Sequence, residues 1–226
     1  MARKKLARFL EVSQYPFYYD LMKDRTESES DRVNQISRLQ RLISNNGQEV
    51  VLELGCGSAD LSVGLAKINR QRLYVALDIQ GERLWRAGQR IIEEQITNLT
   101  LVRGNVRELG EYFAPNTVDQ IWLTFPDPQP KKRNAKHRLT HPRFLDIYRE
   151  ILRPGGEVIL KTDSTELYQY SLEQLEVSPD WEIIKEVVDI DLVSQQSLPQ
   201  GSRIETYFEA KARDKGGGIG MIVTIH

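Results

Sequence analysis

Cysteine is nearly absent from this sequence: one residue, Cys56, occurs among 226. A lone cysteine cannot form a disulfide within the chain, which excludes a disulfide-stabilised secreted domain and fits a reducing compartment. Long apolar runs are missing too, and none approaches the roughly 18 residues that a membrane-spanning helix needs. The basic start of the chain is followed by polar and acidic residues, not by the apolar stretch of a signal peptide. We therefore expect a cytoplasmic protein with no membrane partner.

Histidine is also scarce, with three residues in the chain. His137 and His141 are four positions apart, but no third ligand or acid completes a metal site beside them, so we expect no metal ion. Cys56 lies in a glycine-rich turn, where we expect it to be a small apolar filler and not a nucleophile.

The net charge is only −1 at pH 7, but the charges are unevenly distributed. Residues 1–10 contain four basic and no acidic residues, and residues 129–143 contain six basic and none acidic. Residues 144–210, by contrast, contain fourteen acidic and five basic residues. A polyanion would respond to the two basic segments locally, whatever the net charge. The alternative is that both are solvated loops or tails.

Short apolar segments alternate with helical ones from residue 49 onward. Short strands separated by helices of about 10–15 residues form parallel βαβ units, so we expect an α/β fold with an open, doubly wound sheet. Trp181–Ile190 and Arg203–Ala210 are strand-like with no helical segment between them, so we expect the sheet to finish antiparallel. The other predicted strands are Glu49–Leu54, Leu73–Asp78, Leu99–Arg103, Val118–Thr124 and Glu157–Lys161, and helices are predicted over 31–43, 59–69 and 81–96.

The length and the 40% hydrophobic content suffice for one globular domain, which we place over residues 31–212. Residues 1–30 are basic and aromatic with weak periodicity, so we expect a flexible N-terminal arm. Residues 213–226 contain a cluster of glycines and are predicted to be a C-terminal tail.

A glycine turn over residues 53–60, Glu-Leu-Gly-Cys-Gly-Ser-Ala-Asp, follows the first predicted strand of the sheet. Gly55 and Gly57 would let the backbone approach a ligand at the carboxyl edge of the sheet. Asp60 replaces the third glycine of a dinucleotide fingerprint, and no Gly-Lys-Ser/Thr of a P-loop follows. Glu53 and Asp60 would repel a pyrophosphate but favour a cation, so S-adenosylmethionine suits this turn better than NAD. The alternative is a tight turn without a ligand.

Two polar residues follow the next strands of the predicted sheet. Asp78 ends the second of them, where an acid can accept both ribose hydroxyls of a nucleoside. Asn105 follows the third, where its amide could meet the amino group of adenine. Asn105 could equally cap a helix that starts at Val106, and the two roles are compatible.

A stiff, basic segment over residues 124–138 follows the fourth of these strands. Prolines at 126, 128 and 130 favour an extended backbone and hold Asp127 between two of them. This arrangement would place a carboxylate at a reaction centre beside basic side chains that bind phosphate. The alternative is a proline-rich loop with a solvated charge cluster.

The segment Phe-Pro-Asp-Pro-Gln-Pro-Lys-Lys-Arg at 125–133, continued by Lys136 and Arg138, closely resembles the signature of the bacterial tRNA (guanine-N7-)-methyltransferases. Glu-Leu-Gly-Cys-Gly resembles the family's adenosylmethionine turn, and Leu-Asp-Ile its second-strand acid. Lys-Thr-Asp at 161–163 and Thr-Tyr-Phe-Glu at 206–209 are similar to two further family motifs. The resemblance spans roughly residues 30–210.

The resemblance implies a Rossmann-like class I methyltransferase. Its open, mostly parallel sheet would have seven strands, with the last antiparallel and helices on both faces. The implied activity is methylation of guanine N7 in the variable loop of tRNA with S-adenosylmethionine, by a monomer or homodimer. Two alternatives stay open: a related methyltransferase with another substrate, and a non-catalytic RNA-binding subunit.

The resemblance also assigns roles to individual residues. Asp127 would be the catalytic residue. The implied cofactor-binding residues are Glu53, Gly55, Gly57, Asp78, Asn105 and Asp127; the substrate-binding residues are Lys131, Asp163, Thr206 and Glu209; and the RNA-contacting residues are Lys132, Arg133, Lys136 and Arg138.

Three positions depart from the family pattern. Gln129 stands where tryptophan is common, Ala59 where many members have glycine, and Asn105 where an acid is common. These departures concern base stacking and cofactor affinity, but not the class of reaction.

Overall fold

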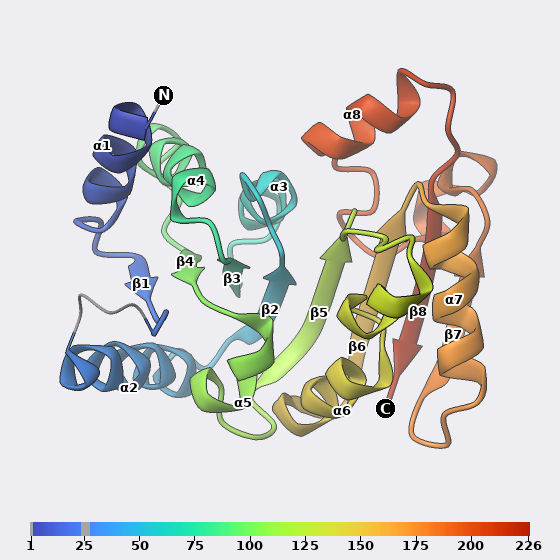
Figure 1. Ribbon diagram of the computed structural model, residues 1–226, viewed down its shortest axis with the longest axis horizontal. Helices are drawn as coiled ribbons and strands as arrows, with labels where there is room; N and C mark the ends of the chain where they lie inside the picture. The colour runs from blue at the N-terminus through green and yellow to red at the C-terminus, as the bar shows by residue number, and fades with distance from the viewer. Residues whose placement is uncertain (1, 24–27) are drawn as a thin grey trace.

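An eight-stranded sheet organises the molecule. The computed structural model describes residues 2–23 and 28–226, and its strands lie in the order β1-β4-β3-β2-β5-β6-β8-β7 (Figure 1). Strands β1 to β6 are parallel, and β8 runs antiparallel to both of its neighbours. The strands are β1 (Tyr18–Asp20), β2 (Glu49–Leu54), β3 (Arg72–Asp78), β4 (Leu99–Arg103), β5 (Val118–Thr124), β6 (Leu152–Thr162), β7 (Glu182–Val187) and β8 (Gly220–Ile225).

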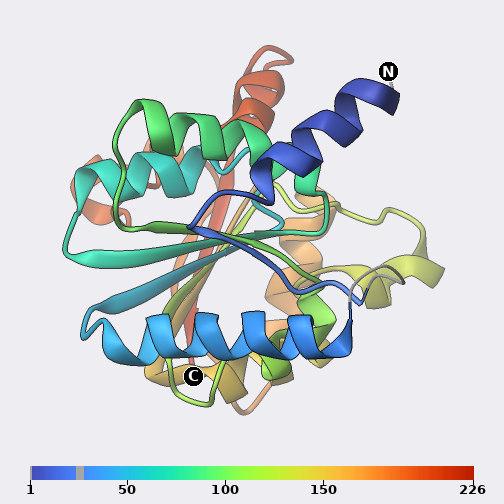
Figure 2. The same cartoon turned by 90° about the vertical axis from the view of Figure 1, so that its left-hand side faces the viewer.

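Helices cover both faces of this sheet (Figure 2). One apolar cluster joins the sheet to α2 (Glu29–Asn45), α5 (Leu109–Tyr112), α6 (Pro142–Ile151) and α7 (Thr165–Glu176). A second joins the opposite face to α1 (Ala2–Val12), α3 (Asp60–Ile68), α4 (Gly81–Glu93) and α8 (Tyr207–Arg213). The predicted α/β fold, with an antiparallel last strand and helices on both faces, is confirmed. The 3-10 helices are η1 (Val106–Glu108), η2 (Lys132–His137), η3 (Ile190–Leu192) and η4 (Gln195–Ser197).

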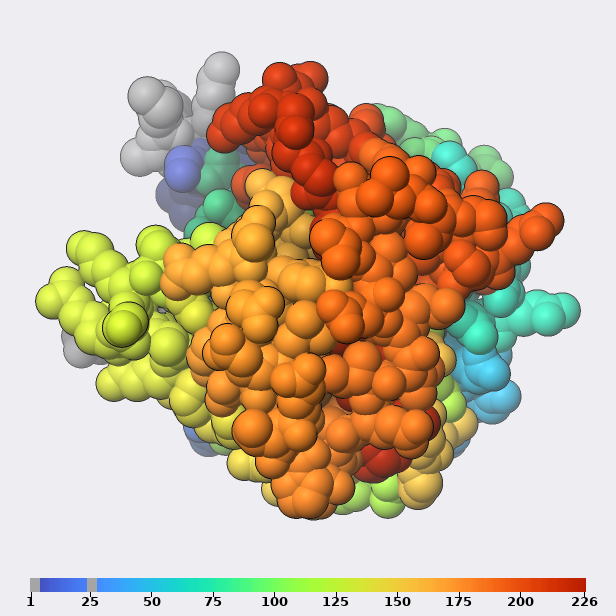
Figure 3. Space-filling model, turned by 90° about the vertical axis from the view of Figure 1, so that its right-hand side faces the viewer, coloured from blue at the N-terminus to red at the C-terminus, as the bar shows by residue number. Residues whose placement is uncertain are grey.

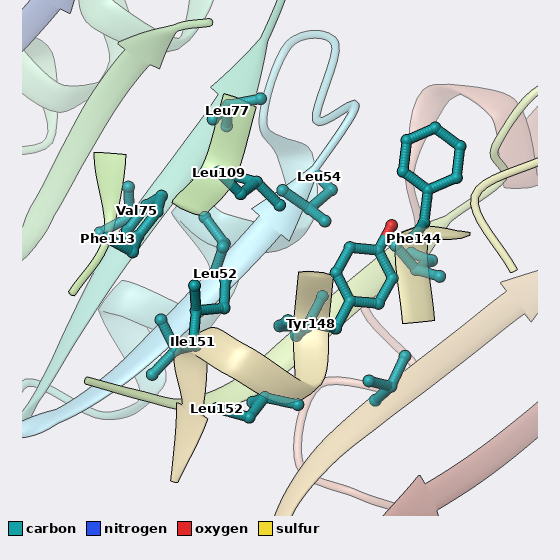
Figure 4. Packing of buried hydrophobic residues seen from close by; sticks show 14 of the residues in the cluster. Leu52, Leu54, Val75, Leu77, Leu109, Phe113, Phe144, Tyr148, Ile151 and Leu152 are labelled. Atoms are coloured by element: carbon teal, nitrogen blue, oxygen red, sulfur yellow. The ribbon is translucent and has the colours of Figure 1, made fainter. Parts of the chain in front are cut away.

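The central strands are buried on both faces, which explains why they consist of nearly continuous apolar runs. In β2, for example, every residue after Glu49 is buried. Leu52 and Leu54 of β2 contact the side chains of α5 and α6 on one face, with Tyr148 packed beside them (Figure 4). The core therefore holds the ends of β2 to β6 at defined positions.

The expectation of seven strands was wrong, because a short strand lies in the predicted N-terminal arm. Tyr18–Asp20 forms β1 and extends the sheet beyond β4. Before it, α1 packs against α4, and the guanidinium of Arg8 lies 4.6 Å from the ring centre of Trp85. The predicted helix 31–43 is confirmed as α2.

The end of the chain also differs from the prediction. Arg203–Ala210 does not form a strand; instead Thr206 accepts a hydrogen bond from the Glu209 backbone at 3.2 Å and starts α8. The last strand comes from the segment that was expected to be a glycine-rich tail. Its β-branched residues favour a strand, and Gly220–Ile225 is inserted between β6 and β7.

The parallel strands β2 to β6 all end at the same edge of the sheet. Ligands of open α/β sheets bind at this edge. Each of four polar features identified from the sequence lies at the end of one of these strands: the glycine turn after β2, Asp78 at the end of β3, Asn105 after β4, and the stiff, basic segment at the end of β5. The fold therefore brings these features together.

Candidate active site

A cleft of about 780 Å³ lies at the carboxyl edge of the sheet. Its walls come from the loops after β2, β3, β4, β5 and β6, and α8 contributes a further wall. Of the residues predicted to bind cofactor or substrate, five line it: Gly55, Asp78, Asn105, Asp127 and Asp163. The sequence thus identified one wall residue from each of the five strand ends.

The glycine turn has the backbone conformation that glycine permits. Gly55 and Gly57 have φ of +69° and +58°, and a Cβ atom built on either meets no protein atom within 4 Å. The space beside the turn is therefore open to a ligand. Ala59 has φ of 53°, a left-handed value that glycine adopts with less strain. Cys56 is buried, which raises the pKa of its thiol and fits the predicted filler role.

Asp78 connects the turn to the second wall of the cleft. Its Oδ2 accepts a hydrogen bond from the Gly57 backbone at 2.8 Å, and its Oδ1 accepts one from the Gln80 backbone at 2.8 Å. The side chain is buried, and burial raises the pKa of this carboxyl. Each carboxylate oxygen keeps a lone pair for a further donor, so Asp78 can accept the hydroxyls of a ribose.

Glu53 lies beneath the turn and not on the wall of the large cleft. Its Oε2 accepts hydrogen bonds from the backbone and hydroxyl of Ser62 at 3.1 and 2.5 Å, and its Oε1 accepts one from the Thr124 hydroxyl at 2.8 Å. Burial raises the pKa of Glu53 to about 7. These contacts tie β2 to α3 and β5, and a direct contact of Glu53 with cofactor stays a prediction.

The buried Glu53 carboxyl should affect how stability depends on pH. The folded protein holds this proton up to about pH 7, whereas the usual carboxyl pKa is 4.5, so the contribution of Glu53 to stability falls as the pH rises between these values. The fall amounts to at most about 3 kcal/mol. We expect Glu53→Gln to remove this part of the pH dependence of the unfolding free energy, measured by urea titration. Glu93→Gln, at an exposed site on α4, should keep the dependence; an unchanged dependence in Glu53→Gln would contradict the burial effect.

Asn105 has one of the two roles considered for it from the sequence, and its position is compatible with the other. Its Oδ1 accepts a hydrogen bond from the Arg107 backbone at 3.1 Å and caps η1, as expected of an N-cap. The residue also lines the cleft beside Asp78. A contact of its amide with adenine therefore fits the geometry and stays a prediction.

Asp127 is held on the cleft wall by a rigid stretch of backbone. Pro126 and Pro128 flank it, and its Oδ1 accepts a hydrogen bond from the Gln129 backbone at 3.0 Å. Phe125 and Gln129, just outside the prolines, have φ of 48° and 45°. Left-handed residues other than glycine cost about 1–3 kcal/mol each and are found at sites where geometry serves a ligand. Asp127 is exposed and is therefore available to a bound molecule.

The remaining substrate-binding predictions have different outcomes. Asp163 lines the cleft, while its neighbour Ser164 caps α7. Lys131 is exposed at the start of η2. Thr206 is buried and caps α8, so its side chain has a structural role in this conformation.

Glu209 is buried, with 1% of its surface exposed. Its Oε2 accepts a hydrogen bond from the Lys161 ammonium at 2.5 Å, and its Oε1 accepts one from Arg213 at 2.8 Å. Glu209 therefore serves within the protein in this conformation, linking α8 to β6. Its contact with substrate stays a prediction.

The basic segment projects from the side of the molecule, in yellow-green in Figure 3. Lys131, Lys132, Arg133 and Lys136 are exposed, and no ion pair of theirs is found in the part of the chain that the structure describes. Arg138 differs: only 4% of its surface is exposed, so its side chain has a structural role in this conformation, and its contact with RNA stays a prediction.

Arg138 instead holds the proline segment against α7. Its guanidinium donates hydrogen bonds to the backbone oxygens of Pro128 at 2.9 Å and Gln129 at 3.2 Å, and it pairs with Glu166. The cleft wall that carries Asp127 is therefore fixed from behind.

Several cleft residues were not predicted as site residues from the sequence. Phe208, Lys211 and Lys215 line it from α8 and the turn that follows. Lys211 and Lys215 are four positions apart, a spacing that places two side chains on the same face of a helix. This spacing did not lead to a prediction, because the segment before them was predicted to be a strand. No group of three or more His, Cys, Asp or Glu residues suited to a metal ion occurs among residues 2–23 and 28–226. Over the same residues, no helix is long and apolar enough to cross a membrane.

Several solved structures of methyltransferases have the same fold. The structure of the 16S rRNA methyltransferase KamB superposes with a TM-score of 0.62 at 14% identity, covering 92% of this chain and 98% of that one. An S-adenosylmethionine-dependent methyltransferase from Aquifex aeolicus superposes with a TM-score of 0.54 at 16% identity, covering 86% and 98%. The chain thus has the Rossmann-like fold class of these methyltransferases, with a glycine-edged cleft at the carboxyl edge of its sheet.

Sequence comparison narrows this class. Residues 47–221 match the family described as "Putative methyltransferase". The tRNA (guanine-N(7)-)-methyltransferases of Cytophaga hutchinsonii and Christiangramia forsetii are 34% and 32% identical to this chain, each over 98% of it and 97% of the relative. The chain belongs to the family of the tRNA (guanine-N(7)-)-methyltransferases.

Proposed function

We propose that this protein transfers a methyl group from S-adenosylmethionine to N7 of guanine in tRNA. The observation that carries the proposal is that Asp127, exposed on the wall of the cleft, lies four positions before Lys131, the first of the exposed basic residues of the same segment. One continuous stretch of chain therefore presents a carboxylate to the reaction and cations to the nucleic acid. The names of the relatives support the same substrate.

The residues of the cleft fit S-adenosylmethionine. Asp78 can accept ribose hydroxyls, and the open space beside Gly55 allows close approach of a ligand. Asp127 and Asp163 give the cleft an acidic wall, which suits a ligand carrying a sulfonium and an amino group. When bound, S-adenosylmethionine supplies an electrophilic methyl group.

Guanine N7 requires little chemistry from the protein because it has an in-plane lone pair and carries no proton. No general base is needed, and the chain has to align N7 and stabilise the positive charge that develops on the purine. Asp127 and Asp163 suit the second task. A carboxylate can also accept hydrogen bonds from N1–H and the 2-amino group of guanine, a pair of donors that adenine lacks.

The exposed basic segment supplies the contact with RNA. A base within folded RNA must be unstacked before it can enter a cleft, and cations on the neighbouring phosphates can hold the strand meanwhile. The exposure of Lys132, Arg133 and Lys136 on η2 supports this role. We further propose that the protein acts in the cytoplasm, without a metal, as a monomer or homodimer.

Neutralising the basic segment should weaken the salt dependence of RNA binding. Each lost phosphate contact lowers the slope of log K against log salt by about 0.7–0.9, so the Lys132→Gln, Arg133→Gln and Lys136→Gln triple variant should lower it by about two. The slope is measured by titrating unmodified tRNA at several KCl concentrations. A matched triple variant at Arg41, Arg70 and Lys185, away from the cleft, should keep the parent slope. An unchanged slope in the first variant would remove η2 from the RNA contact.

The experiment that tests the function is a methylation assay. Purified protein is incubated with unmodified tRNA and labelled S-adenosylmethionine, and the modified nucleotide is mapped by aniline-induced scission. Label at N7 of a guanine in the variable loop is the expected result. Label on another atom or substrate would favour a different methyltransferase, and cofactor binding without label would favour a non-catalytic RNA-binding subunit.

A further inference from the structure

Three basic side chains from separate elements meet beside the cleft. Arg107 lies in η1, His137 ends η2, and Arg143 lies in the first turn of α6. The Nη2 atoms of Arg107 and Arg143 lie 3.0 and 3.4 Å from Nδ1 of His137. We call these three residues the Arg-His-Arg cluster.

The cluster has more hydrogen-bond donors than acceptors. A guanidinium can only donate, so Nδ1 of His137 must accept, and a single ring nitrogen has one lone pair for two guanidinium groups. No ion pair of Arg107 or Arg143 is found with any described residue. Nε of Arg143 is buried and has no hydrogen-bond partner. Unsatisfied buried donors are costly, so the cluster lacks an acceptor that a bound molecule could supply.

The electrostatics of the cluster agree with this deficit. Burial, followed by the charges of Arg107 and Arg143, lowers the pKa of His137. Burial and the charge of Arg107 also lower the pKa of Arg143. Both shifts indicate positive charges that are not compensated locally, and an anion at this position would compensate them.

The position of the cluster identifies the source of that anion. Arg107 and His137 line the same cleft as Asn105 and Asp127, and the guanidinium of Arg143 lies 4.4 Å from the ring centre of Phe144, another cleft residue. The exposed residues Lys132 and Lys136 of η2 lead to the cluster from outside. An RNA strand that follows η2 into the cleft would therefore reach the cluster where its base enters.

We infer that the Arg-His-Arg cluster binds a phosphodiester of the RNA strand next to the target guanine. This inference rests on the proposed function and extends the RNA contact from η2 to Arg107 and Arg143. A phosphate presents several acceptor oxygens to converging guanidinium groups, and arginine suits such multidentate contacts. The contact would hold the backbone of the nucleotide while its base lies in the cleft.

The test compares Arg107→Gln, Arg143→Gln and the double variant with the parent. Unmodified tRNA is titrated at several KCl concentrations, and S-adenosylhomocysteine affinity is measured separately. Each single change should weaken tRNA binding several-fold and lower the salt slope by about 0.7–0.9, with cofactor affinity unchanged. Arg41→Gln, at an exposed arginine of α2 that does not line the cleft, should change neither.

The Arg107→Lys and Arg143→Lys double variant keeps both positive charges, so it should recover most of the salt slope of tRNA binding. This variant therefore distinguishes a lost phosphate contact from a loss of folding. An unchanged slope in folded Gln variants would overturn the inference. Weaker S-adenosylhomocysteine binding at an unchanged slope would also overturn it, because the cluster would then serve the cofactor. If the parent binds tRNA but does not methylate it, the proposed function fails while the slopes still test the cluster.

Discussion

Asp127→Ala is expected to lower the rate of methyl transfer by at least about 10²–10³-fold, the loss that follows when one group stabilising the transition-state charge is removed. Asp127 lies on the cleft wall between two prolines, so neighbouring side chains cannot easily move to replace it. The rate is measured in single-turnover assays with saturating tRNA and S-adenosylmethionine.

Two controls accompany this variant. Asp146→Asn, at an exposed aspartate of α6, should keep the parent rate. Circular dichroism and tRNA affinity of Asp127→Ala should match the parent, because the carboxylate makes its described hydrogen bond only to the neighbouring Gln129 backbone. Activity within a few-fold of the parent would refute the catalytic role.

Glu209→Leu should produce the largest loss of stability. Lys161 is fully buried at the end of β6, and Glu209 is its partner; the Ile204 carbonyl oxygen, at 3.2 Å, is its other acceptor. Breaking a buried ion pair on one side costs about 3–5 kcal/mol because a charge is left uncompensated. The unfolding free energy is measured by urea titration.

The double variant Lys161→Met with Glu209→Leu is the informative control. Replacing both members of a buried ion pair with apolar residues is often nearly neutral, so the double variant should recover much of the lost stability. If the double variant is as unstable as Glu209→Leu alone, the cost comes from the packing of α8 and not from the buried charge.

Much of the fold could be predicted because its signals are local. Strands β2 to β5 were predicted to within one residue, since each is a short, largely apolar segment bounded by polar turns. The end of the chain could not be predicted in the same way. The alternation from Arg203 to Ala210 suggested a strand, but the capping hydroxyl of Thr206 and packing against the sheet favour a helix.

The candidate site shows the same division. Asp78, Asp127 and Asp163 follow strand ends, so the topology alone places them at one cleft. Burial of Glu209 and Arg138 depends on partners from distant segments, Lys161 of β6 and Glu166 of α7, which no local pattern reveals. The Arg-His-Arg cluster could not be predicted from local patterns either. Its three residues come from separate elements, and Arg107 lies outside the basic segment at 124–138.

The position of β8 has a consequence for the order of folding. β7 does not pair with β6 directly; Lys161 of β6 and Val187 of β7 both pair with Met221 of β8. β7 therefore has to wait for a segment synthesised more than thirty residues later before it can join the sheet. Until β8 is inserted, two unsatisfied strand edges face each other, and such edges are templates for pairing between molecules. Shortening the chain before Gly220 should therefore produce aggregates and not a smaller soluble domain.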